Sequence, residues 1–193
     1  MAEIEYFYSA HSAFAYLGSA RFMAIATAAG RRIAHKPVDL NRVIAAAGST
    51  AFGARGKKHR AYFFAREIER WAEERDAPVL AGYPRHHAND TTLVNGMVIA
   101  GLMQGLDVDR LAHRFLEAHW RDDADLAEPE TLAELGRAVD LEPGPLLEAA
   151  LSPEVSAVYE QNTEEAIRRS VFGSPTYFID GDMFVSVVAG SPC

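Results

Sequence analysis

The sequence predicts an α/β fold with strand-forming regions near both ends of the chain and a long helical region between them. Near the N-terminus, two strand-like runs flank one helical run, a spacing typical of a βαβ unit. Near the C-terminus, two further strand-like runs are joined by a hairpin signal. The chain has 193 residues, of which 49% are hydrophobic and 24% are charged. A globular core is therefore expected without disulfides or a structural metal.

The first strand is predicted at residues 4–8, which read IEYFY and contain no breaker. Ser12 is a good N-cap for the helix that follows, and Gly30 is a plausible stop. Apolar residues recur in this helix at spacings of three and four, at Phe14, Leu17, Ala20, Ala24 and Ala28. Because Phe22 and Ile25 lie on another face, the helix is expected to be buried on two sides. Residues 33–38 predict a second, parallel strand.

Residues 39 to about 170 predict helices and no strand. Apolar residues at helical spacing, prolines suited to a first turn and one Ser-Pro cap mark the segments near 64–72, 93–100, 111–118, 129, 143 and 152–169.

The last predicted element is a hairpin, with strands at 176–179 and 183–188 around the turn Asp180-Gly181. The order βαβ, helices, ββ is that of a thioredoxin-like core with a large all-helical insertion. We expect residues 1–40 and 165–193 to form the core and residues 41–164 to form the inserted helical domain.

Charge and cysteine content limit the function. The net charge of −8 argues against nucleic acid or an anionic membrane as the main partner. The N-terminus lacks the pattern of a signal peptide, and no apolar run approaches the roughly 18 residues of a membrane span. Cys193 is the only cysteine, which excludes an intramolecular disulfide and a cysteine metal cluster. A cytoplasmic protein is expected.

Ser12 and Ser174 are the first candidate site residues. Ser12 would lie at a helix N-terminus, where the partial positive charge favours an anion, and its hydroxyl could donate to a bound thiolate. A plain N-cap is the simpler alternative. In a thioredoxin-like core, a cis Pro175 would lie opposite this helix start and leave the backbone of Ser174 available to a peptide ligand. The alternative there is a trans turn.

Two further groups of residues are candidates for binding a metal or an anionic ligand. His86 and His87 lie in a predicted loop, where we expect them to be solvated; without partners at metal-ligand spacing, no metal site is expected. The basic run at residues 55–60 is interpreted as a solvated helix start, although one arginine from it could bind a carboxylate ligand.

Five motifs together resemble one family. They are YSAHSAFAYLG at residues 8–18, PVDL at 37–40, ERW at 69–71, NTEEAI at 162–167 and VFGSPTY at 171–177. This pattern is similar to that of the bacterial 2-hydroxychromene-2-carboxylate isomerases, which are DsbA-like thioredoxin-fold proteins related to the kappa-class glutathione transferases. The resemblance covers about residues 4–184.

The resemblance implies a glutathione cofactor, with Ser12 facing its sulfur and Ser174, before a cis Pro175, binding its backbone. It implies that Arg55, and less directly Arg85, bind the carboxylate of a small aromatic substrate. The implied reaction converts 2-hydroxychromene-2-carboxylate, or a related aromatic, to trans-o-hydroxybenzylidenepyruvate in aromatic catabolism. A homodimer is expected from the family.

The sequence departs from the family pattern at three places. Ala13 replaces a usual proline, and Ile44 replaces a lysine that contacts substrate. After Phe184 the family continues with a glutathione-binding segment and a terminal helix, whereas residues 185–193 read VSVVAGSPC. We expect the usual C-terminal helix to be missing and the hairpin to expose apolar surface.

Other functions stay open at this point. A kappa-type glutathione transferase or peroxidase could use the same Ser12 site. A third alternative is a non-catalytic binding or scaffold protein, a family member disabled by its altered tail. A thiol–disulfide oxidoreductase is disfavoured, because residues 12–15 read SAFA and carry no sulfur.

Overall fold

The computed structural model describes residues 2–49 and 54–185, which contain one four-stranded sheet in the order β2-β1-β3-β4. β1 pairs with β2 in parallel and with β3 antiparallel, and β3 continues into β4 through a hairpin. The strands are β1 (Glu3–Tyr8), β2 (Arg32–Pro37), β3 (Thr176–Ile179) and β4 (Asp182–Val185). This is the predicted βαβ … ββ core.

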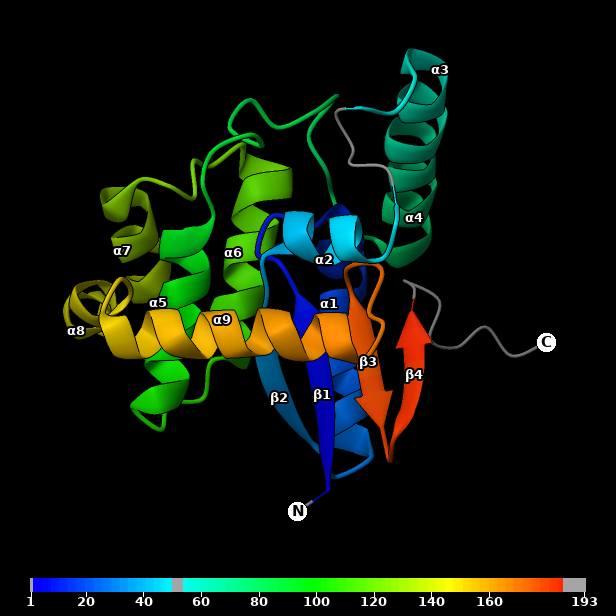
Figure 1. Ribbon diagram of the computed structural model, residues 1–193. Helices are drawn as coiled ribbons and strands as arrows, with labels where there is room; N and C mark the ends of the chain where they lie inside the picture. Colours follow the sequence, from blue (N-terminus) through cyan, green and yellow to red (C-terminus); the bar gives the residue numbers. More distant parts are fainter. Residues whose placement is uncertain (1, 50–53, 186–193) are drawn as a thin grey trace.

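Two long helices cover the sheet, one on each face: α1 (Ala13–Ala28) and α9 (Pro153–Arg168), the latter drawn across the front in Figure 1. The remaining helical elements are α2 (Leu40–Ala46), α3 (Lys57–His59), the π-helical η2 (Arg60–Arg66), α4 (Glu67–Arg75), α5 (Thr92–Met103), α6 (Asp109–Asp122), α7 (Pro129–Arg137) and α8 (Pro143–Ala149). The described residues from α2 to α9 contain no strand, as predicted. The short helix α2 was not predicted. The division into core and insertion stays a prediction; its boundary at 164/165 lies inside α9.

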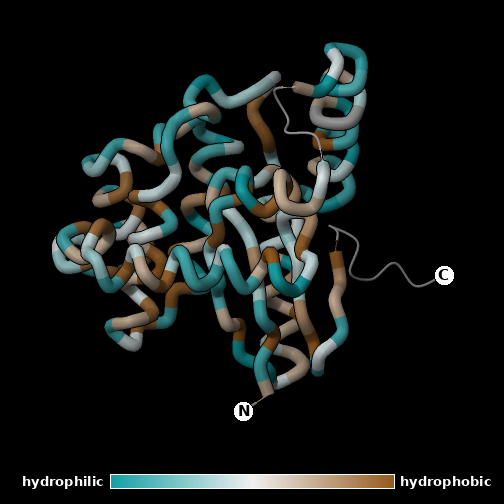
Figure 2. The backbone as a smooth tube through the Cα atoms, in the orientation of Figure 1, coloured by the Kyte–Doolittle hydropathy of each residue, from teal (hydrophilic) through white to brown (hydrophobic). Residues whose placement is uncertain are grey.

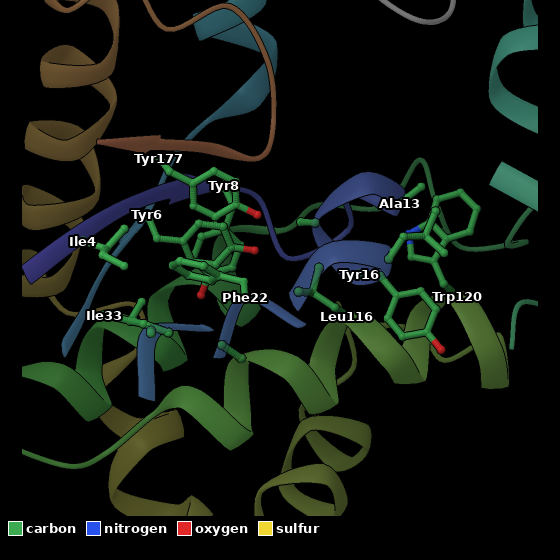
Figure 3. Packing of buried hydrophobic residues seen from close by; sticks show 14 of the residues in the cluster. Ile4, Tyr6, Tyr8, Ala13, Tyr16, Phe22, Ile33, Leu116, Trp120 and Tyr177 are labelled. Carbon is green, nitrogen blue, oxygen red and sulfur yellow. The ribbon is translucent and has the colours of Figure 1, made fainter. Parts of the chain in front are cut away.

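Alternation along β1 separates two apolar layers. Tyr6 and Tyr8 stack at 4.1 Å between ring centroids, and Tyr6 also contacts Phe22 of α1 and Tyr177 of β3 (Figure 3). Phe7 faces the other way, into the cluster beneath α9. The strand is therefore buried on both sides, as expected for a central strand.

The expected two-sided burial of α1 holds only for its first half. Residues 13–19 are buried except for the half-buried Phe14, because α6 packs against this half from the side away from the sheet. Beyond them, Phe22 and Ala26 are buried, whereas Ile25 is 41% exposed. The prediction failed also for three residues of the apolar stripe, which are exposed: Ala20, Ala24 and Ala28.

The hairpin turn is confirmed, with positive φ at both Asp180 (53°) and Gly181 (96°), as a tight two-residue connection requires. β4 is an edge strand, and its Met183 and Phe184 side chains are 38% and 51% exposed. Residues 186–193 lie outside the described part of the chain. The extension of this strand to 188 and the missing C-terminal helix therefore stay predictions.

Helices α5 to α8, called the helical block below, form a second core. Gly96 of α5 lies so close to α8 that a Cβ there would be 2.1 Å from the carbonyl oxygen of Ala150. Residues 57–75 (α3, η2 and α4), called the arm below, stand above β3 and β4 in Figure 1 and are largely hydrophilic in Figure 2. In the described ranges, no helix combines the length and apolarity that a membrane crossing requires.

Candidate functional site

A cavity of about 560 Å³ opens where the start of α1, the turn before β3 and the arm meet. This volume is typical of small-molecule sites. Its walls are mainly apolar and aromatic, with a few polar groups near the start of α1. The lining residues are His11, Ser12, Ala13, Phe14, Leu40, Asn41, Ile44, Ser49, Arg55, Glu67, Trp71, Tyr83, His87, Trp120, Phe172, Gly173, Ser174, Pro175 and Val185.

Ser12 caps α1 at the wall of this cavity, as predicted. Its hydroxyl oxygen accepts a hydrogen bond from the Ala15 amide at 3.3 Å, and its hydroxyl donates to the carbonyl of Ser174 at 3.0 Å. The N-terminus of the 16-residue helix α1 therefore lies at the cavity, where its partial positive charge stabilises an anion.

Ser174 lies next to the helix start and also lines the cavity, and the Ser174–Pro175 peptide bond is cis. The Ser174 hydroxyl oxygen accepts from the amide of Ser9 at 3.2 Å, which ties the two walls together. No hydrogen bond within the described ranges uses the amide N–H of Ser174. A peptide-like ligand can therefore use this amide as a donor.

The loop before α1 is held by two residues of the helical block that sequence analysis missed. Asn95, fully buried, accepts from the Ala10 amide at 3.1 Å and donates to the Tyr159 hydroxyl at 3.2 Å. Trp120, which lies beside Ala13 in Figure 3, donates its indole N–H to the carbonyl of His11 at 2.9 Å. These contacts fix the backbone on which Ser12 stands. No local sequence signal marks them.

The expectation that both loop histidines are solvated is wrong for His87. Its ring lines the cavity and is hydrogen-bonded to buried His119 at 2.9 Å between Nδ1 and Nε2. Burial lowers the pKa of His87 to about 2 and that of His11, also on the cavity wall, to about 4. Both rings are therefore neutral at physiological pH. His86 instead forms a contact of 3.2 Å with Asp125.

The two arginines predicted to bind substrate lie in different places. Arg55 lines the cavity, and the following residues 57–59 are exposed, as the solvated helix start predicts. Arg85 does not line the cavity: its side chain is 80% exposed and is paired with Asp123. Because this carboxylate already binds the Arg85 guanidinium, the structure does not bring Arg85 to the site. Among the described residues, no group of three side chains is arranged to hold a metal ion.

Comparisons with known proteins agree with this architecture. Two curated proteins named 2-hydroxychromene-2-carboxylate isomerase, from Sphingobium xenophagum and Pseudomonas sp. (strain C18), are each 25% identical over 94% of this chain, covering 90% and 83% of their own lengths. A solved HCCA isomerase superposes with a TM-score of 0.77 at 22% identity, over 96% of this chain and 89% of the other. The cytosolic disulfide reductase DsbM from Pseudomonas aeruginosa superposes with a TM-score of 0.69 at 18% identity, over 94% and 87%.

The family comparison extends across almost the whole chain. Residues 3–191 match the DSBA-like thioredoxin domain. The strand order, the cis proline opposite the start of α1 and the helical region between β2 and β3 fit that match. The chain therefore belongs to the DSBA-like thioredoxin family.

Proposed function

We propose that the protein is a glutathione-dependent isomerase acting on 2-hydroxychromene-2-carboxylate or a related aromatic carboxylate. The observation that carries this proposal is the Ser12 hydroxyl at the start of α1, which lines the cavity and donates a hydrogen bond to the backbone carbonyl of Ser174. A dithiol enzyme of this family would need a cysteine here, and residues 12–15 carry none. The curated isomerases, matched over 94% of the chain, support this activity over disulfide exchange.

The residues present fit glutathione. The Ser174 amide suits the backbone of a peptide, while the Ser12 hydroxyl and the N-terminus of α1 suit an anionic sulfur. DsbM, whose fold is shared at 15% identity, has been solved with GSH, so the fold is compatible with this ligand. When bound, glutathione supplies a nucleophilic thiolate, which none of the described lining residues provides.

The chain's own residues would bind and orient the substrate. Trp71 and Trp120 give the cavity flat apolar walls for an aromatic ring. Arg55 brings positive charge to the same cavity, which favours a carboxylate at that side. Ser12, which lines the same cavity, would then stabilise negative charge close to the ring. Orientation and charge stabilisation are the two contributions that such a reaction needs from a protein.

The test compares two serine caps. Ser12→Ala should lower glutathione-dependent isomerisation about 100-fold, since a lost donor to a reacting anion has that order of effect. Ser152→Ala is the matched control: Ser152 caps α9, accepts from the Val155 amide at 3.2 Å and does not line the cavity. Ser152→Ala should lower the free energy of unfolding by a similar amount and keep the wild-type rate of isomerisation.

The same assay separates the alternatives. Unchanged turnover in Ser12→Ala would refute the Ser12 assignment. Consumption of one glutathione per product would indicate a transferase instead of an isomerase. A folded chain that fails to bind glutathione in calorimetry would contradict the proposal and favour a non-catalytic family member.

A further inference from the structure

Three histidines form a row from the helical block to the cavity beside Ser12. His119 of α6 is 1% exposed, and its Nε2 lies 2.9 Å from Nδ1 of His87. The ring of His87 packs edge-to-face against that of His11, with 4.7 Å between the centroids. His11 and His87 line the cavity, whereas His119 does not. The row thus connects a buried group to the ligand space.

The contacts of His119 determine the tautomer of His87. The carbonyl of Ala124, 3.1 Å from Nδ1 of His119, can only accept a hydrogen bond, so that Nδ1 carries the proton. Burial lowers the pKa of His119, so its ring is neutral and its Nε2 is an acceptor. Nδ1 of His87 must then donate to it. In the neutral ring of His87, Nε2 is therefore left as an acceptor.

The contact of His11 with Ser9 determines the opposite tautomer. Ser9 is fully buried, and the only partner of its hydroxyl within the described ranges is Nδ1 of His11, at 2.9 Å. A buried hydroxyl that does not donate loses a hydrogen bond, so the Ser9 hydroxyl donates and Nδ1 of His11 accepts. Nε2 of the neutral His11 ring then carries the proton and is a donor.

Both Nε2 atoms belong to rings that line the cavity, and both are accessible to solvent. Neither makes a hydrogen bond with any described residue. In the same part of the chain, some buried side-chain nitrogen or oxygen atoms, such as the Tyr6 hydroxyl, have no hydrogen-bond partner. The Nε2 atoms of His11 and His87 are not among them, so solvent reaches both.

We propose that Nε2 of His11 and Nε2 of His87 form a donor–acceptor pair that binds a hydroxyl group on an aromatic ligand. A hydroxyl oxygen can accept from His11 while its proton is donated to His87. A carboxylate has no proton to donate to Nε2 of His87. Its oxygens would therefore face the lone pair of that nitrogen, which is unfavourable. The pair therefore selects the position of the hydroxyl on the ligand, while Arg55, which lines the same cavity, brings positive charge for the carboxylate. This inference rests on the proposed function in placing an aromatic ligand in the cavity, and not on the use of glutathione.

The first test observes the tautomers directly in the ligand-free wild-type protein. Two-bond ¹H–¹⁵N correlation spectra at pH 7 distinguish a proton on Nδ1 from one on Nε2. We expect the Nδ1–H form for His87 and His119 and the Nε2–H form for His11. His87 in the Nε2–H form, or a protonated His87, would overturn the proposal. This measurement uses the wild-type protein alone. It therefore needs no substrate and does not depend on whether a variant folds.

The second test measures binding of 1-naphthol and 1-methoxynaphthalene by calorimetry without glutathione. Only the naphthol can donate, so it should bind the wild type about five- to tenfold more tightly, the order expected for one neutral hydrogen bond. In His87→Phe this ratio should fall to about one, because the acceptor is lost while an aromatic ring remains. His11→Phe should weaken both ligands and keep the ratio.

His86→Ala is the control, because His86 lies next to His87 in the chain but outside the cavity lining. It should keep the wild-type ratio. A naphthol preference that persists in His87→Phe would refute the acceptor role, and so would an equal affinity of the wild type for both probes. Absence of glutathione-dependent turnover would count against the proposed function and would leave the probe ratio and the tautomers unaffected.

Discussion

The helical block and the arm both border the cavity, but they are packed very differently. Val94 and Met97 of the block are completely buried, and Gly96 between them meets the backbone of α8 directly. In the arm, only Ile68 and Ala72 are buried among the described side chains. Regions with few buried contacts open at lower free-energy cost than a packed core.

This difference separates two tasks at the site. The block supports the loop of His11 and Ser12 through Asn95 and Trp120. The arm contributes Glu67 and Trp71 to the wall of the cavity. Reacting groups need a rigid support, whereas a wall that admits ligands benefits from adjustment. The molecule places Ser12 on its better-packed side.

The largest expected effect is that of Gly96→Val in the block. A Cβ at this position would be 2.1 Å from the Ala150 carbonyl oxygen, so α5 and α8 must separate. We expect a loss of about 3 kcal/mol or more in unfolding free energy, measured by urea denaturation. Gly144→Ala, where the nearest atom is 3.6 Å away, should cost little. Equal effects would show that the block is not tightly packed at α5.

Asn95→Leu should have the next largest effect. The substitution leaves the buried Ala10 amide without its acceptor and removes the bond to Tyr159. We expect a loss of about 2 to 3 kcal/mol in stability and weaker glutathione binding. Tyr159→Phe, which removes only the second bond, should cost about 1 kcal/mol. If Asn95→Leu kept full glutathione affinity, the block would not be what positions the Ser12 loop.

The cavity histidines predict a pH dependence of stability. Burial lowers the pKa of His11 to about 4 and of His87 to about 2, whereas both titrate near about 6.5 when unfolded. Below that value the unfolded state binds more protons, so their stabilising contribution is complete above pH of about 6.5 and is lost as pH falls.

We expect the free energy of unfolding to fall between pH 6.5 and 5 by up to about 1.4 kcal/mol per pH unit for each histidine. Carboxyl groups titrate mainly below this window. Denaturation of His87→Phe should show a shallower slope than the wild type. An identical slope would show that His87 is not buried in its neutral form.

The smallest effect is expected in the arm, for Arg66→Ala. Arg66 is 48% exposed and lies 3.1 Å from Glu69 and 3.9 Å from Glu73. Exposed pairs of this kind contribute less than about 0.5 kcal/mol, and added salt should remove the difference from wild type in thermal unfolding. If Arg66→Ala lost as much stability as Asn95→Leu, the arm would not be more loosely packed than the helical block.

Features with local signals could be predicted from the sequence. The strand residues 4–8, the turn Asp180-Gly181 and the Ser12 cap each depend on neighbours within a few positions. The helix α2 also has such a signal, since Asp39 accepts from the Arg42 amide at 3.1 Å, but its seven residues give little periodicity. Short helices are marginal without tertiary packing, which the sequence pattern alone does not show.

The supporting part of the site could not be predicted in this way. Asn95 acts on Ala10 across 85 positions, and the burial of His87 depends on a partner 32 positions away. Local composition marks His87 as a loop residue, and only the packing of α6 shows it to be part of the wall. Ser12 and Ser174 were predicted because each lies at the end of a recognisable element.

The contact between Ser12 and Ser174 affects how strongly the Ser12 hydroxyl can bind the sulfur of a ligand. The Ser12 hydroxyl already donates to a carbonyl at 3.0 Å, so a neutral thiol, which is a weaker acceptor than a carbonyl, would gain nothing by replacing it. A charged sulfur forms a much stronger bond with the same hydroxyl and also interacts with the dipole of α1. The site thus favours a charged sulfur over a neutral thiol. Under the proposed function, glutathione should therefore bind with the release of a proton, and its calorimetric heat should vary with the ionisation enthalpy of the buffer.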